Sequence, residues 1–343
     1  MKIPVAILGA TGSVGQRFVS LLADHPYFEI SELFASMKSA GKPYGESVNW
    51  VIDQPVPESV KTLPVKSLDD RVEADIVFSA LPASIAAGLE RELADRGKYV
   101  FTNASAHRMD HDVPILVPEV NPDHFEIVRG KRGFIVANPN CTTSGLVIPL
   151  KVIKDSAGIE DVLVVTMQAI SGAGYPGIPS LSIFDNLIPH IENEEEKVRR
   201  ESRKILGQVT SSGVEPADFR VEARCTRVPV RDGHTEVVFV KTSKPISPDR
   251  LKHELENFRG LPQKMNLPTA PARPIIVEDD RTRPQPYSDR LNGNGMSVTV
   301  GNLRADSIMG ITFTLVVHNT IRGAAGGSIL NAELALKSGI LDL

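Results

Sequence analysis

The sequence predicts an α/β protein with a doubly wound parallel sheet, followed by a second α+β domain whose sheet is mostly antiparallel. Three observations lead to this prediction. The 343 residues exceed the usual size of a single hydrophobic core. Residues 1–140 alternate short apolar runs with helical patterns, which is typical of a parallel sheet. Beyond residue 160 the apolar runs are longer, and few helices separate them.

The composition excludes several classes of protein. Hydrophobic residues make up 41% of the chain and charged residues 23%, as in an ordinary globular protein. The net charge of −4 provides no basic surface, so we expect neither a nucleic-acid nor a membrane partner. No apolar run approaches the roughly 18 residues of a membrane span. Two cysteines form no disulfide framework, so we expect a cytoplasmic protein, and we expect no metal site.

The first element is a continuous apolar run at residues 4–8, which predicts a strand buried on both faces. A glycine turn follows, and residues 16–22 then have helical spacing. Strand, glycine turn and helix together favour a dinucleotide site, because the glycines let a pyrophosphate approach the helix start. The spacing is G-x-x-G-x-x-G, so a plain strand-to-helix turn is the alternative. The expected cofactor contacts are Gly9, Thr11, Gly12, Ser13, Val14 and Gly15.

The segment after the second strand, residues 30–35, indicates which dinucleotide the protein binds. An NAD site usually has an acidic residue after this strand to hold the ribose 2′-hydroxyl. This chain has Ser36, Lys38 and Ser39 there, which suit a 2′-phosphate, so we predict NADP. A solvated loop is the alternative.

Further elements continue the parallel pattern: a strand within residues 75–82, a helix at 85–97 and a strand at 99–103. Leu81 and Pro82 follow the first of these strands, at the carboxyl end where such sheets bind ligands. We therefore predict a Rossmann-type domain over residues 1–140.

The next strand, residues 133–137, leads through Asn138-Pro139-Asn140-Cys141-Thr142-Thr143 into a helix. A thiol at a helix start lies near unpaired N–H groups and the positive end of the helix dipole, and both favour thiolate. The same N–H groups can stabilise an oxyanion. We therefore interpret Cys141 as a nucleophile for acyl transfer, with a small buried apolar residue as the alternative.

The second domain, residues 141–318, contains a strand at 162–170, a loop from Ser171 to Gly177 and a charged helix at 192–206. Strands are predicted at 220–230, 235–242 and 308–318. Residues 267–289 are Pro-rich and are predicted to form an extended arm or interface loop. A final helix opens at residue 319 and runs through 336; it either packs tightly or returns to line a nicotinamide pocket, completing the first domain with residues 319–343.

Together these segments resemble the aspartate-β-semialdehyde dehydrogenase family, in its archaeal and fungal-type branch, over essentially the whole chain. The specific parts are the glycine turn, the hexapeptide around Cys141, Ser171-Gly172-Ala173-Gly174, Arg227 with His234, and residues 319–327. The resemblance implies reduction of L-aspartyl-4-phosphate by NADPH to the semialdehyde and phosphate, on the route to lysine, methionine and threonine. It also implies a homodimer or homotetramer.

The resemblance implies a role for each matching residue. Cys141 is the nucleophile, His234 the acid/base catalyst and Gln168 the group that orients the substrate. The substrate-binding residues implied are Arg227 for the carboxylate, Glu194 for the amino group (uncertain within 194–196), and Asn103, Arg108 and Lys197 for the phosphate. Further cofactor contacts implied are Ser171, Gly172, Gly174 and Asn319.

The residue types are also suited to this reaction when they are considered apart from the resemblance. Acyl phosphate reduction needs a soft nucleophile, a proton shuttle and a hydride donor. His234 follows Asp232-Gly233, so we expect it at a turn rather than in the core, and on the same sheet edge as Arg227. Glu194 and Lys197 share a helix face, although a solvated pair is the alternative.

Three rival functions remain open from the sequence. An acyl-CoA reductase such as malonyl-CoA reductase would use the same cysteine and NADPH but release coenzyme A. N-acetylglutamyl-phosphate reductase performs the same type of reaction. A NADP-binding sensor would have lost catalysis, which the intact Cys141 and His234 argue against.

Overall fold

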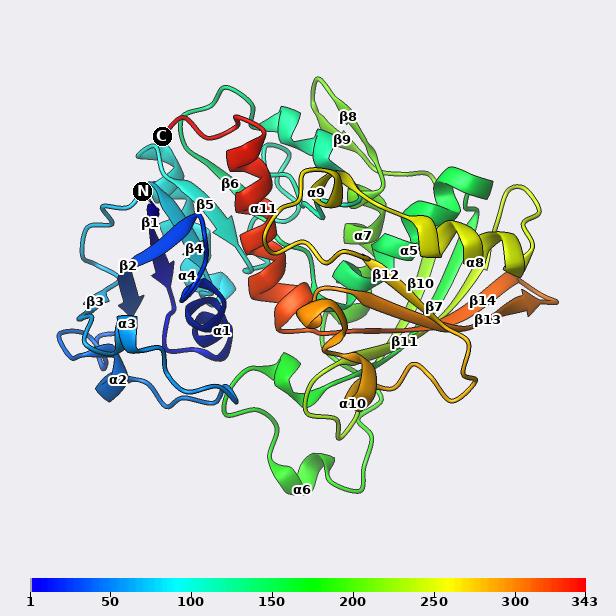
Figure 1. Cartoon of the computed structure of the whole chain (residues 1–343), viewed down its shortest axis with the longest axis horizontal. Coiled ribbons are helices and arrows are strands. Elements are labelled where there is room, and N and C mark those ends of the chain that lie inside the picture. The colour runs from blue at the N-terminus through cyan, green and yellow to red at the C-terminus, as the bar shows by residue number, and fades with distance from the viewer. Residues whose placement is uncertain (1) are drawn as a thin grey trace.

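The computed structural model describes residues 2–343, which form two six-stranded sheets (Figure 1). The first sheet has the order β3-β2-β1-β4-β5-β6, and every neighbouring pair is parallel. The doubly wound prediction is therefore confirmed. The order reverses between β1 and β4, which is where such sheets bind ligands. The strands are β1 (Ile3–Leu8), β2 (Phe28–Ala35), β3 (Val65–Ser67), β4 (Ile76–Ser79), β5 (Tyr99–Thr102) and β6 (Phe134–Ala137).

Helices cover both faces of the first sheet because its strands are apolar on both sides. On one face α1 (Ser13–Leu22) and α11 (Gly326–Lys337) contribute Phe18 and Leu330 to the hydrophobic cluster that contains Phe101. On the other face α4 (Ala83–Asp95) packs Leu93 against Val100. Figure 1 shows α11, the last helix of the chain, beside strands formed from the first 140 residues. The chain end therefore returns to the first sheet, as the sequence predicts.

The second sheet has the order β10-β7-β11-β14-β13-β12. Its three inner pairs are antiparallel and its two outer pairs, β10 with β7 and β12 with β13, are parallel. α5 (Cys141–Ala157), α7 (Glu194–Ile205) and α8 (Pro248–Asn257) pack on one face. On the opposite face Leu163 and Val165 are 41% and 42% exposed. The strands are β7 (Asp161–Gln168), β10 (Arg220–Arg227), β11 (His234–Lys241), β12 (Ile275–Glu278), β13 (Val298–Asp306) and β14 (Gly310–Val317).

Among the elements of the second domain that were not predicted are α8, β12 and β13. The extended-arm prediction for residues 267–289 is wrong for Ile275–Glu278, which forms the edge strand β12 beside β13. The remaining short elements are α2 (Tyr44–Ser47), α3 (Glu58–Lys61), α6 (Ser180–Ile183), β8 (Gln208–Thr210), β9 (Gly213–Glu215), α9 (Leu261–Lys264), α10 (Pro286–Asp289), three 3₁₀ turns (Pro122–Ile127, Ile170–Ala173, Asn292–Gly295) and a π turn (Ile321–Ala325). Across residues 2–343, none of the helices combines the length and apolar character that a bilayer crossing demands.

Candidate active site

Cys141 is the first residue of α5, at the junction predicted from the sequence. Asn140 caps the helix, and its Oδ1 accepts hydrogen bonds from the N–H groups of Thr142 (3.0 Å) and Thr143 (3.3 Å). Two of the N–H groups that we expected to stabilise an oxyanion are therefore already bonded, which leaves that of Cys141 itself. An Asn directly before an apolar-faced helix is a sequence signal for an N-cap, so this role of Asn140 was readable in advance.

The thiol lines a cavity of about 310 Å³ between the two sheets. Most of the predicted site residues meet there, although they come from widely separated parts of the sequence. The predicted residues that line the cavity are Ser13, Val14, Leu81, Asn103, Arg108, Cys141, Gln168, Ser171, Gly172, Gly174, Glu194, Lys197 and Asn319.

His234 lies directly against the nucleophile, with Nε2 3.1 Å from the Sγ of Cys141. The expectation that it lies at a turn rather than in the core is wrong: His234 begins β11 and is fully buried. The N–H of Ala169 donates to its Nδ1 (3.0 Å), so Nδ1 carries no proton and Nε2 carries the N–H that faces sulfur. Burial and then the charge of Arg227 lower the pKa of His234 to about 3, so the imidazole is neutral.

Arg227 ends β10 at the same end of the sheet as His234, but the two strands are not neighbours, because β7 lies between them. Its Nη1 donates to the carbonyl of Ala169 (2.8 Å). A Cβ added at Gly172 would lie 2.8 Å from that same nitrogen and 3.3 Å from the Cε1 of His234. The glycine therefore lets the loop after β7 lie directly over both side chains.

The thiol of Cys141 is not ionised at neutral pH in this structure. Burial and then the carboxylate of Glu194 raise its pKa to about 12, while Arg108 and Arg227 act in the opposite direction. The prediction that the helix start alone would favour thiolate is therefore wrong, because desolvation outweighs the helix dipole.

Glu194 is the glutamate of the 194–196 cluster that faces the cavity. Its Oε2 accepts from the Nδ2 of Asn140 (2.8 Å) and its Oε1 from the Nζ of Lys197 (2.8 Å). Although burial opposes ionisation, Lys197 and Asn140 hold the pKa of Glu194 below its usual value. Its neighbours turn away from the cavity: Glu195 pairs with Arg224 and Glu196 with Arg199.

Arg108 and Asn103 add a cation and an amide to the lining of the cavity. Arg108 is buried, and its guanidinium donates to Glu201 Oε1 (3.0 Å), to the carbonyl of Asn138 (3.0 Å) and to that of Asn103 (2.8 Å). The side-chain Oδ1 and Nδ2 of Asn103 are buried without a partner. This fixed guanidinium and unpaired amide suit an anionic group.

Two supporting residues, Thr142 and Glu201, were given no role from the sequence. Gln168 Nε2 donates to the Oγ1 of Thr142 (2.8 Å), which orients its amide. Glu201 accepts from Arg108 and from the N–H of Asn140 (2.6 Å). Glu201 lies seven residues after Glu194, on the same face of α7, and this spacing was the available signal.

The turn Ile321–Ala325 closes the cavity from the chain end. Asn138 Nδ2 donates to the carbonyl of Gly323 (3.2 Å), and a Cβ at Gly323 would lie 2.8 Å from the Cβ of Cys141. Arg322 forms a fully buried bidentate ion pair with Glu119 (2.8 and 2.5 Å), which anchors the turn.

The glycine turn after β1 fits a dinucleotide. Gly9 has φ +76°, and a Cβ there would lie 2.8 Å from the carbonyl oxygen of Ala80; one at Gly15 would lie 2.1 Å from that of Gly9. Gly12 is the N-cap of α1 and offers no side chain to cap the helix, so backbone N–H groups at the helix start are free for phosphate. Ser36 and Lys38 are exposed and Ser39 is half-buried just beyond the end of β2, and Pro82 is the N-cap of α4.

No group of three His, Cys, Asp or Glu side chains within residues 2–343 is placed to hold a metal ion.

Comparison with known proteins gives concordant matches along the chain. The family model described as semialdehyde dehydrogenase, NAD binding domain, matches residues 4–128. The one described as semialdehyde dehydrogenase, dimerisation domain, matches residues 150–322.

Individual relatives match over nearly the full length. An aspartate-semialdehyde dehydrogenase from Archaeoglobus fulgidus is 49% identical, covering 99% of this chain and 100% of its own. A malonyl CoA reductase (NADP) from Metallosphaera sedula is 42% identical, covering 99% and 98%. The crystal structure of aspartate semialdehyde dehydrogenase with NADP from Candida albicans superposes with a TM-score of 0.93 at 38% identity, covering 99% of this chain and 100% of that one.

Proposed function

The chain belongs to the aspartate-semialdehyde dehydrogenase family, and from that premise we propose which of its residues carry the reaction. It is a NADP-dependent enzyme that reduces L-aspartyl-4-phosphate to L-aspartate-4-semialdehyde and phosphate, on the route to lysine, methionine and threonine. One observation carries the assignment of roles. The Sγ of Cys141 lies 3.1 Å from the Nε2 of His234, beside a cavity lined by the carboxylate of Glu194 and by the cations of Arg108 and Lys197.

Glu194 and Arg227 bind the amino-acid end of the substrate in this proposal. Glu194 is ionised and lines the cavity, so it suits the α-ammonium group. The guanidinium of Arg227 has one hydrogen bond, to a backbone carbonyl, so it retains donors for the α-carboxylate. Gln168, oriented by Thr142, holds the reacting end.

Binding of the substrate also prepares the nucleophile. The negative charge of Glu194 is one of the causes that raise the pKa of Cys141. A substrate ammonium group neutralises that charge, so the thiol pKa falls when the substrate is in place. The thiol then loses its proton to water, the thiolate attacks the acyl carbonyl, the C–O bond to phosphate breaks, and a thioester forms on Cys141. Arg108, Lys197 and Asn103 hold the departing phosphate.

The cofactor fits the turn at residues 9–15, where the glycines leave space and α1 presents free N–H groups. When bound, NADPH supplies the hydride that reduces the thioester. We propose that one end of the cofactor is bound by Ser36, Lys38 and Ser39, and the other end by Ser171 and Asn319. His234 directs its Nε2–H at sulfur and stabilises the thiolate that leaves as the aldehyde forms.

We further propose the division into residues 1–140 with 319–343, and residues 141–318. The two separate sheets support this division. The uncovered face of the second sheet, with Leu163 and Val165 exposed, supports a homodimer or homotetramer. A cytoplasmic location is proposed because both cysteines are free.

A steady-state assay with NADPH tests the substrate assignment against its rival. Aspartyl phosphate should be the better substrate, because malonyl-CoA has no ammonium group for Glu194. Phosphate-dependent oxidation of the semialdehyde, with NADP and then NAD, measures the cofactor preference. A higher kcat/KM for malonyl-CoA would replace this proposal with the acyl-CoA reductase.

A second experiment tests the nucleophile. Cys141→Ala should abolish reduction and leave NADPH binding nearly intact, whereas Cys225→Ala, in the core of the second sheet, should retain turnover. Substantial turnover by Cys141→Ala would contradict the thioester.

A further inference from the structure

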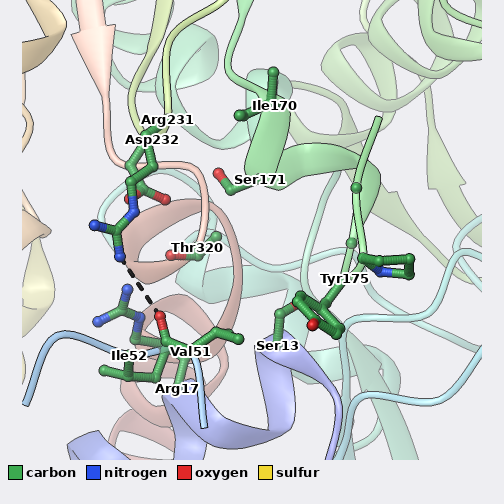
Figure 2. A pocket seen from close by; sticks show the side chains of 13 residues that line it. Ser13, Arg17, Val51, Ile52, Ile170, Ser171, Tyr175, Arg231, Asp232 and Thr320 are labelled. Carbon is green, nitrogen blue, oxygen red and sulfur yellow. Dashed lines mark hydrogen bonds and ion pairs between the residues drawn. The ribbon is translucent and has the colours of Figure 1, made fainter. Parts of the chain in front are cut away.

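A second cavity, of about 170 Å³, lies beside the Cys141 cavity at the boundary between the two sheets (Figure 2). Its walls come from α1, from the segment after α2, from the loop after β7 and from the turn between β10 and β11. It shares Ser13, Ser171, Gly174 and Thr320 with the Cys141 cavity. It contains neither Cys141 nor any residue to which we assign substrate binding, and Arg17, Val51 and Ile52 line this cavity but not the other.

Arg17 faces this cavity without a bonded anion. Its Nε is buried and has no hydrogen-bond partner. Burial, the largest influence, lowers the pKa of Arg17, and Asp232 and Asp53 oppose that shift only through space. Arg231, on the same wall in Figure 2, is paired: it donates to Asp53 at 2.7 Å and lies 3.5 Å from Asp232. An enclosed cation without a hydrogen-bonded counter-ion costs free energy, so Arg17 is the group in this cavity that lacks an anion.

The rest of the lining indicates what kind of anion fits. Figure 2 shows the hydroxyls of Ser171 and Thr320 beside the cavity, where they can donate to an oxyanion. Ile52, Ile170 and Tyr175 supply apolar surface. A guanidinium with hydroxyl donors suits a planar carboxylate, and the apolar walls suit a short hydrocarbon chain rather than a bare inorganic ion.

We propose that this cavity binds a small organic carboxylate, with its anionic group on Arg17 and its hydrocarbon against Ile52 and Ile170, while the cofactor occupies the neighbouring cavity. Ser171 accepts a hydrogen bond from Asn319 (2.7 Å), and both residues line the Cys141 cavity. An occupant therefore acts on residues beside the cofactor and changes the KM for NADPH without contacting Cys141.

The proposal is tested by calorimetric titration of sodium butyrate into the full chain saturated with NADPH. Butyrate should bind, and butyramide, its neutral isostere, should bind at least about tenfold more weakly because it lacks the charge. Arg17→Gln should remove butyrate binding and the butyrate-dependent shift in KM for NADPH. The matched control is Arg220→Gln, since that exposed arginine pairs with Asp161 on the second sheet and should leave binding unchanged.

A second variant keeps the test decisive if Arg17→Gln fails to fold. Ile52→Asp places a carboxylate in the cavity to pair with Arg17, so it should raise the thermal midpoint and abolish butyrate binding. Displacement of butyrate by NADPH would make the cavity part of the cofactor site and overturn the proposal. Equal affinity for butyrate and butyramide, equal affinity for sulfate, or undiminished butyrate binding by Arg17→Gln would also overturn it.

Discussion

Gly323 is the point where the chain end approaches the nucleophile most closely, and Gly323→Ala tests whether that approach positions the sulfur. The new Cβ would lie 2.8 Å from the Cβ of Cys141, 2.9 Å from its Cα and 3.0 Å from its carbonyl oxygen. Carbon atoms pack at about 3.5–4.0 Å, so the two segments must separate by roughly 0.5–1 Å. No flexible side-chain end is present to yield, and therefore the backbone at Cys141 moves.

Two effects of different size follow from this separation. Overpacking costs about 1–3 kcal/mol of unfolding free energy. A displacement of about 1 Å at the reacting group can lower kcat on the order of 100-fold, because the 3.1 Å contact between Cys141 and His234 is lost. We therefore expect a large fall in kcat with a modest loss of stability.

The assay combines kcat for NADPH oxidation, the rate of Cys141 alkylation by iodoacetamide, and urea unfolding. Gly88→Ala is the matched control, because that glycine lies in α4 with open space where a Cβ would be added. It should leave kcat unchanged and raise stability by roughly 0.5–1 kcal/mol. Wild-type kcat in folded Gly323→Ala would refute the reasoning.

Three other perturbations test separate parts of the structure. Glu194→Gln removes a charge that raises the pKa of Cys141, so iodoacetamide should alkylate the free enzyme faster at pH 8 while aspartyl phosphate turnover falls. Arg322→Met leaves buried Glu119 unpaired and should cost about 3–5 kcal/mol in urea unfolding. Burial raises the pKa of Glu236 well above 4.5, so it is protonated when folded and ionises on unfolding. Stability should therefore fall as pH rises above about 4.5, and Glu236→Gln should remove that contribution to the fall.

Each of these predictions has its own contradicting result. Glu195→Gln, whose carboxylate pairs with Arg224 away from the cavity, is the control for alkylation. Equal alkylation rates for the Glu194 and Glu195 variants would show that the charge of Glu194 does not raise the pKa of the Cys141 thiol. If Arg322→Met lowers the free energy of unfolding by less than about 1 kcal/mol, the ion pair does not stabilise the fold. Identical pH profiles of stability for wild type and Glu236→Gln would contradict the buried neutral acid.

Five strands of the first sheet, β1, β2, β4, β5 and β6, were predictable because apolar residues bounded by turn residues mark them. β3, with the sequence Val65-Lys66-Ser67, has no such signal and was not predicted. β12 and β13 were not, because their local signals are weak. β12 has four residues within a Pro-rich segment, and β13 is interrupted after Val300 by Gly301 and by Asn302, which has φ +52°. These segments become strands through pairing with each other and with β14.

The site shows the same division between local and long-range information. The helix start at Cys141 and the glycine turn are local features and were correctly located. The depth of His234 was not predictable, because 93 residues separate it from Cys141 and only the order of the second sheet brings them together. The thiol pKa was mispredicted for a related reason, since burial and Glu194 are supplied by other segments.

The position of α11 has a consequence for how the protein is made. Ile329, Leu330 and Leu334 cover a face of a sheet whose strands all lie before residue 140. During translation that face stays partly uncovered until residues 326–337 have been synthesised, although nascent domains usually fold in N-to-C order. We therefore expect the nucleotide-binding half to finish folding after the half that follows it. A chain released before residue 326 would expose hydrophobic residues of the first sheet, so we expect chaperones to bind it and NADP not to.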